Sequence, residues 1–259
     1  VGAPGMDVDH DLIAAGHPPL HFEFASFHAH MPRHWPDWKD RDATKSPRGR
    51  ADFEGRAWYI GQIVNAHAAL DLLADRAADK AKPWPEFAEY DCASCHQDLG
   101  ASGSAKRKPG TPPWGSYLAL TARAFELVPS TSMPKSLTDL QVAMNASFKP
   151  NRERVAKDAR AAAQFYQLHL DSKLGDHPRW QNLLARLLES GGQRSKNDAT
   201  QTRLGVIALY NMHSDMKLTL PADLEKSVVK FAGQTARPSP HDPEAIRTRL
   251  DLFRKRADR

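Results

Sequence analysis

Both cysteines of this 259-residue chain stand in one pentapeptide, Cys92-Ala93-Ser94-Cys95-His96. The C-x-x-C-H spacing is the sequence signature for covalent attachment of a c-type haem. Each thiol can form a thioether with one vinyl group of the porphyrin, and the histidine that follows is then held beneath the iron as the proximal ligand. The pattern therefore predicts one covalently attached haem c, held by Cys92, Cys95 and His96, around which this part of the chain must fold.

The cysteine pair has two other possible uses, and so short a motif could also occur by chance. Cys92 and Cys95 could form a redox-active disulfide, although such pairs usually lie near a βαβ pattern, which is not apparent in this sequence. They could also bind zinc together with His96 and another histidine. Structural zinc sites usually show a second ligand pair at tight spacing, however, and this chain has no second cysteine pair. Haem attachment is the favoured interpretation.

The composition narrows the class of protein. Hydrophobic residues make up 41% of the chain, which is enough for a sizeable core, and no stretch approaches the ~20 apolar residues that a membrane span requires. The net charge of +5 suits docking to an acidic protein or an anionic surface. The Lys and Arg residues form no concentrated stripe interleaved with aromatic residues, so nucleic acid is not an expected partner.

Helical periodicity dominates the sequence outside the motif. Apolar residues recur at spacings of three and four, proline and glycine fall between these runs, and no run alternates as a strand would. Helices are expected over residues 51–80, 114–128, 136–147, 151–172, 178–190, 197–216, 220–233 and 242–257. The predicted fold class is all-α, with a loop-rich haem-binding region in residues 1–112 followed by a helical bundle in residues 113–259.

The predicted helix over residues 51–80 carries one further histidine. Its apolar positions include Ala57, Ile60, Val64 and Leu70, and this stripe places His67 on or near the buried face. A histidine of the core with its hydrogen bonds satisfied is the more common occupant of such a position, so His67 is not the expected iron ligand.

The N-terminal region is the expected source of the second axial ligand. Six of the twelve histidines lie in residues 1–50: His10, His17, His21, His28, His30 and His34. Imidazole is a common iron ligand, and a low-spin c-type haem needs a second axial group. Residues 9–15 are expected to form a short helix that ends at Gly16. His17 would follow it in a fixed, non-helical backbone before Pro18, which suits a rigid ligand.

Several segments around the motif resemble multihaem c-type cytochromes, the group related to the tetrahaem electron carriers of nitrogen-cycle bacteria. The resemblance covers about residues 1–120, and its motifs are fairly specific. It is carried by residues 7–20 (DVDHDLIAAGHPPL), 22–24 (FEF), 32–35 (PRHW), 84–92 (WPEFAEYDC) and 109–114 (PGTPPW). Two features depart from the family: relatives commonly carry several C-x-x-C-H motifs, and Gln97 stands where a second histidine is expected.

The resemblance implies a ranking of the distal ligands. His17, His10 and His34 match the family pattern, in that order of preference, whereas His21, His28 and His30 do not. Met6 or Met31 is the less favoured alternative, and would raise the reduction potential. The chain looks like the C-terminal portion of a longer multihaem protein, so some of these histidines are expected to serve haems outside it.

Electron transfer through a six-coordinate haem, within a multihaem cytochrome or larger redox complex, is the favoured functional hypothesis. The expected partners are redox proteins, above all another haem-bearing polypeptide of the same complex. A catalytic nitrogen-oxide oxidoreductase is the alternative, and it would need an open iron position and a proton donor. A structural or assembly role for the helical part is a third. Covalent haem attachment requires export, so a periplasmic location is expected, with the targeting signal outside this chain.

Overall fold

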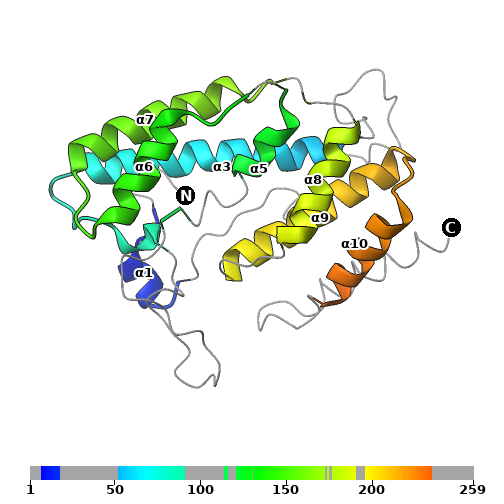
Figure 1. Cartoon of the computed structure of the whole chain (residues 1–259). Coiled ribbons are helices and arrows are strands. Elements are labelled where there is room, and N and C mark those ends of the chain that lie inside the picture. The colour runs from blue at the N-terminus through cyan, green and yellow to red at the C-terminus, as the bar shows by residue number, and fades with distance from the viewer. Residues whose placement is uncertain are drawn as a thin grey trace, which may run out of the picture. The chain divides into compact units, whose positions relative to one another are not determined.

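The described part of the chain is helical, as the periodicity predicts. The computed structural model describes residues 7–17, 52–90, 114–115, 121–129, 131–172, 174, 177–190 and 196–234 (Figure 1). Within these ranges the helices are α1 (His10–Ala14), α3 (Phe53–Ala78), α5 (Thr121–Ala124), α6 (Lys135–Ala146), α7 (Arg152–Leu168), α8 (His177–Ser190), α9 (Lys196–Asp215) and α10 (Ala222–Gln234). Two short 3₁₀ turns, η3 (Phe87–Glu89) and η5 (Phe125–Leu127), accompany them. The all-α prediction is confirmed for this part of the chain.

Most predicted helices begin and end within a few residues of the observed ones. The exception is the helix expected over residues 114–128, because Trp114 lies in an isolated antiparallel bridge with Tyr90 and helical structure is described only from Thr121. Trp114 gives its backbone N–H to Asn145 Oδ1 at 2.8 Å, a bond that a helix start does not require. The predicted helix over 242–257 lies outside the described residues.

The chain divides into two compact units. The first contains α1, η3, α5, η5, α6, α7 and α3 from Tyr59 onward; the second contains α8, α10, most of α9, and α3 up to Trp58. The predicted boundary between residues 112 and 113 lies outside the described ranges and stays a prediction.

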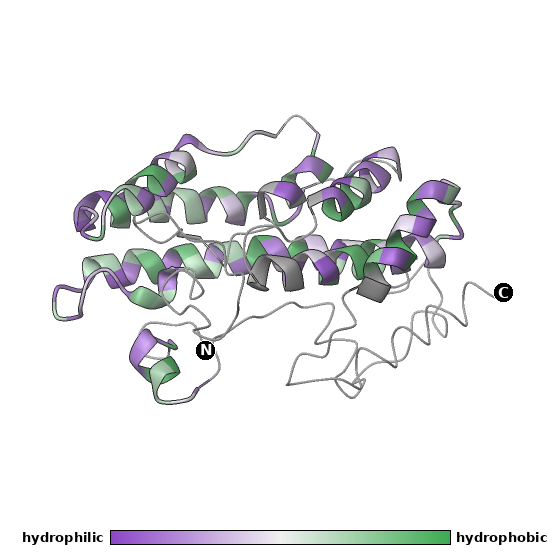
Figure 2. Ribbon diagram, turned by 60° about the horizontal axis from the view of Figure 1, so that its bottom comes forward, coloured by the Kyte–Doolittle hydropathy of each residue, from purple (hydrophilic) through white to green (hydrophobic). Residues whose placement is uncertain are grey.

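In the first unit, α3 buries one side and α6 packs on α7. The fully buried side chains of α3 there repeat at three-to-four spacing: Tyr59, Ile63, Ala66, Leu70, Leu73 and Ala77. The expected placement of Ile60 and Val64 on this face is wrong, because they lie one position away from that repeat and are 44% and 48% exposed. His67 lies at its margin, with Nδ1 3.4 Å from Asp71 Oδ2. Figure 2 shows that the helices carry both hydrophobic and hydrophilic residues, as amphipathic helices do.

The second unit depends on a close approach of helices at Gly55. A Cβ added there would overlap Met212 Sδ and lie 2.9 Å from Trp180 Cζ3. Asn211 also donates to Glu54 Oε2 at 2.8 Å, which ties α9 to the first turn of α3. The missing side chain of Gly55 is therefore what allows α3, α8 and α9 to meet here.

We expect Gly55→Ala to destabilise the protein by about 1–3 kcal/mol, the usual cost of overpacking a core. Helix propensity alone predicts the opposite, a gain of up to about 1 kcal/mol. Denaturant unfolding measures the difference. The cost of Gly55→Ala should be smaller when it is measured in a Met212→Ala background, since the truncated Met212 leaves room for the new methyl group. A stabilised Gly55→Ala variant would contradict this account of the packing.

Candidate functional site

The predicted attachment residues lie between two chain positions that the structure brings together. Cys92, Cys95 and His96 fall in residues 91–113, outside the described ranges, as does the candidate ligand His34. The flanking residues Tyr90 and Trp114 are paired in the antiparallel bridge, and Gly115 N–H donates to Glu89 O at 3.5 Å. The two residues that flank the segment over 91–113 therefore lie side by side.

Aromatic residues hold the chain just before the motif. Trp84 donates its indole N–H to Pro150 O at 2.7 Å, and the Tyr90 hydroxyl donates to Met144 O at 3.4 Å. Burial, helped by the nearby Glu89 carboxylate, raises the pKa of Tyr90 to about 12, so its phenol stays neutral at ordinary pH. Trp84 and Tyr90 are thus engaged with the protein itself. Phe87, by contrast, is 56% exposed.

A buried guanidinium joins the chain on both sides of the motif to the N-terminal segment. Arg76, near the end of α3, donates to Glu89 Oε1 at 2.6 Å and, through two nitrogens, to Asp7 Oδ2 at 2.7 and 3.0 Å. Trp114 Nε1 donates to the other Glu89 oxygen at 3.4 Å. We call Asp7, Arg76, Glu89 and Trp114 the Arg76 cluster. It connects four segments that are far apart in the sequence.

The charges of the Arg76 cluster are almost fully removed from water. The side chains of Arg76, Asp7 and Glu89 are 6%, 7% and 5% exposed. Burial alone would raise the pKa of Asp7, but the hydrogen bonds and charge of Arg76 outweigh it and lower that pKa. Burial raises the pKa of Glu89, and Arg76 and Trp114 offset part of the rise. Because an unpaired buried charge is costly, each charged group depends on its partners.

The helix α1, which begins at the ligand candidate His10 and is followed by the candidate His17, is capped at both ends. The Asp9 side chain accepts from Leu12 N–H at 2.9 Å. At the other end, Gly16 N–H donates to Ile13 O and His17 N–H to Leu12 O, the two bonds of a Schellman motif. Gly16 has φ +104°, a conformation that favours glycine. The predicted helix ending at Gly16, with His17 just beyond it, is confirmed.

Of the two histidines, His10 is placed against the turn that precedes the motif. Its backbone N–H donates to Glu86 Oε1 at 2.8 Å, and its ring meets the Phe87 ring edge-on with the centroids 5.7 Å apart. The His10 side chain is 39% exposed. His17 lies at the opposite end of α1 and is exposed. The geometry thus ties His10 to η3, which ends three residues before Cys92, whereas the family pattern ranks His17 first.

No group of three or more His, Cys, Asp or Glu side chains suited to a metal ion occurs within the described ranges. Likewise, none of the helices traced there is both long and apolar enough to cross a membrane. Comparison of the chain with protein-family models, curated proteins and solved structures gives no match. The assignment of a cofactor therefore rests on the residues of this chain.

The sequence analysis missed the Arg76 cluster, although one signal was available. Arg76 falls among Leu73, Ala74 and Ala77, which are all buried, so a charge in that register needs a buried counter-charge. Which carboxylates provide it was not predictable, because Asp7 and Glu89 lie 69 and 13 positions away along the chain.

We expect Arg76→Met to destabilise the protein by about 3–5 kcal/mol, because it leaves Glu89 buried without its cation and leaves Asp7 with Lys82 alone, 3.7 Å away. Denaturant unfolding measures the loss. Arg160→Met is the matched control: Arg160 lies 3.6 Å from Asp75 at the surface, with its side chain 53% exposed, and should cost under about 1 kcal/mol. Equal losses in the two variants would show that the Arg76 cluster contributes no more than a surface pair.

Proposed function

We propose that this chain attaches one haem c through Cys92 and Cys95, ligates its iron with His96, and transfers electrons within a multihaem cytochrome or larger redox complex. The observation that carries the proposal is the C-x-x-C-H pentapeptide, which holds both cysteines of the chain. Its donor set fits the group: two thiols for the vinyl carbons and an adjacent imidazole for the iron. A bound haem supplies a centre that gains and loses single electrons.

The described structure supports this proposal through the anchoring of the motif segment. Tyr90 and Trp114 hold its two ends together, and the Arg76 cluster fixes both to α3. A redox group works best on a support that does not rearrange, and buried, mutually dependent contacts provide one. The same cluster brings the N-terminal segment, with His10, to this support.

A second histidine on the iron would favour electron transfer over catalysis. Iron held by two histidines would leave no position for a substrate, so the chain would hold the group and exchange electrons with a neighbour. The contacts of His10 with Glu86 and Phe87 favour it as that ligand. The net charge of +5 favours an acidic redox partner. The proposed location is the periplasm or an equivalent exported compartment.

Haem attachment is tested by mass. When the chain is produced together with a c-type haem attachment system, we expect its mass to rise by one haem and the increase to survive denaturation. Replacing both Cys92 and Cys95 with Ala should abolish covalent incorporation, since no thioether can then form, whereas Cys95→Ala alone should lower the yield of covalent haem, since one thioether remains possible. Ser94→Ala is the control, because it changes the motif but keeps both thiols. Zinc without haem in the purified chain, or covalent haem in the double variant, would refute the proposal.

The axial ligand is tested by visible spectroscopy of the haem-loaded chain. We expect a low-spin spectrum that carbon monoxide and cyanide leave unchanged, and we expect His10→Ala to convert it to a high-spin form that binds both. His17→Ala is the paired variant and should stay low-spin. If His17→Ala, and not His10→Ala, converts the haem to the high-spin form, then His17 is the ligand, as the family pattern implies. A high-spin, ligand-binding wild type would contradict electron transfer and favour the nitrogen-oxide oxidoreductase.

A further inference from the structure

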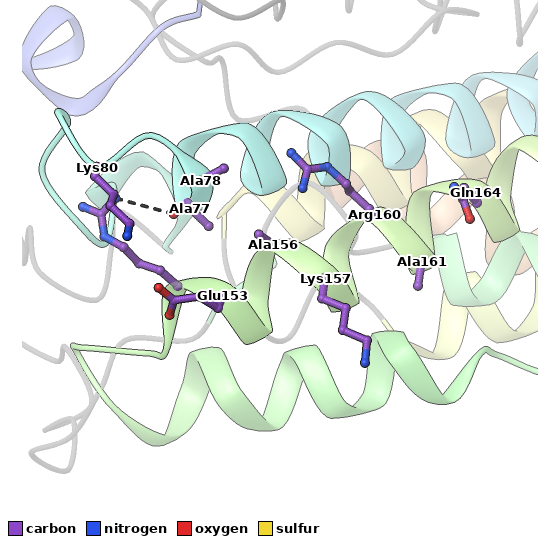
Figure 3. A pocket seen from close by; sticks show the side chains of 10 residues that line it. Ala77, Ala78, Lys80, Glu153, Ala156, Lys157, Arg160, Ala161 and Gln164 are labelled. Carbon is purple, nitrogen blue, oxygen red and sulfur yellow. Dashed lines mark hydrogen bonds between the residues drawn. The ribbon is translucent and has the colours of Figure 1, made fainter.

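A groove in the first unit lies between the C-terminal end of α3 and α7, along which its lining extends from Arg152 to Gln164 (Figure 3). Its floor is made of small side chains. Ala77 and Ala156 are buried there, and Ala78 and Ala161 line its open side. Because alanine fills little space, the two helices leave a shallow apolar channel along their line of contact.

Arg152 fixes one end of this groove. Its guanidinium donates to Asp79 O at 2.6 Å and to Lys82 O at 2.7 Å, both in the chain that follows α3. The same group lies 5.5 Å from the centre of the Trp84 ring. These contacts join the start of α7 to the chain that follows α3.

The charges that line the groove are predominantly positive. Lys80 and Lys157 are exposed, and the half-exposed Arg160 side chain lies 3.6 Å from Asp75. With Arg152, the lining holds four cationic side chains and one carboxylate, that of Glu153. The cations do not converge on one point: Figure 3 shows Arg160 extending toward α3 and Lys157 extending from the other side of α7.

We propose that this groove binds an acidic, extended or helical segment of a partner protein. Cations spread along a channel suit several carboxylates on one chain better than a single compact anion, which needs donors aimed at one place. The alanine floor leaves room for apolar side chains between those carboxylates. A membrane surface fits less well, because the described floor offers no bulky apolar side chain for insertion. The proposal stands independently of the haem.

The probe for this test is a short fluorescein-labelled peptide of repeated Glu-Ala-Leu units, and its affinity for the full chain is measured by fluorescence anisotropy at low salt. We expect it to bind, and the triple variant Lys80→Gln, Lys157→Gln, Arg160→Gln to weaken binding about tenfold, the combined effect of three exposed charge pairs. The variant Ala161→Leu, which fills the groove without changing charge, should also weaken it. Circular dichroism checks that both variants remain folded.

The matched control removes the same charge elsewhere. Lys149→Gln, Lys226→Gln and Lys230→Gln together remove the same charge from exposed lysines that do not line the groove, and should leave peptide affinity within about twofold. Equal weakening by both triples, no effect of Ala161→Leu, or equal binding of a Lys-Ala-Leu peptide would overturn the proposal. Binding to phosphatidylserine vesicles but not to the peptide would overturn it in favour of a membrane surface.

Discussion

The interaction on which the first unit depends is the buried charge of Arg76. A guanidinium is tolerated out of water only when its N–H groups have acceptors. Here the acceptors are the carboxylates of Asp7 and Glu89 and the backbone oxygen of Val8. The carboxylates depend on Arg76 in turn, because a buried carboxylate without its guanidinium also destabilises the folded protein. The result is that the N-terminal segment, α3 and the turn before the motif are fixed as one arrangement.

The features that the sequence predicted well are those whose signals are local. Apolar spacing and prolines located α6 and α7 to within a few residues, and Gly16 marked the end of α1. These signals depend on neighbouring positions only. The face of α3 was predicted less well, because Ile60 and Val64 repeat at a helical spacing just as the buried residues do, and only the packed structure shows which repeat faces the core.

The features that the sequence could not provide are contacts across long chain distances. The C-x-x-C-H spacing by itself indicates haem attachment, but no local signal indicates that Tyr90, before the motif, pairs with Trp114, after it. The same holds for His10: its resemblance to a family motif made it a candidate, but its position beside Glu86 and Phe87 follows from how distant segments pack. The chemistry of the candidate site could therefore be predicted from the sequence, whereas the contacts around it could not.

The bridge between Tyr90 and Trp114 has a consequence for the order in which such a site can be assembled. Within the described part of the chain, the two ends of the segment over residues 91–113 are brought together by Glu89, Tyr90, Trp114 and Asn145, none of which belongs to the motif. These contacts use protein groups alone, so a cofactor added afterwards would join a segment whose ends already lie together. The length of such a segment has little effect on the entropy of closing it, since doubling the length costs only about 0.6 kcal/mol. Evolution could thus rebuild the motif segment without rebuilding the helices that hold it.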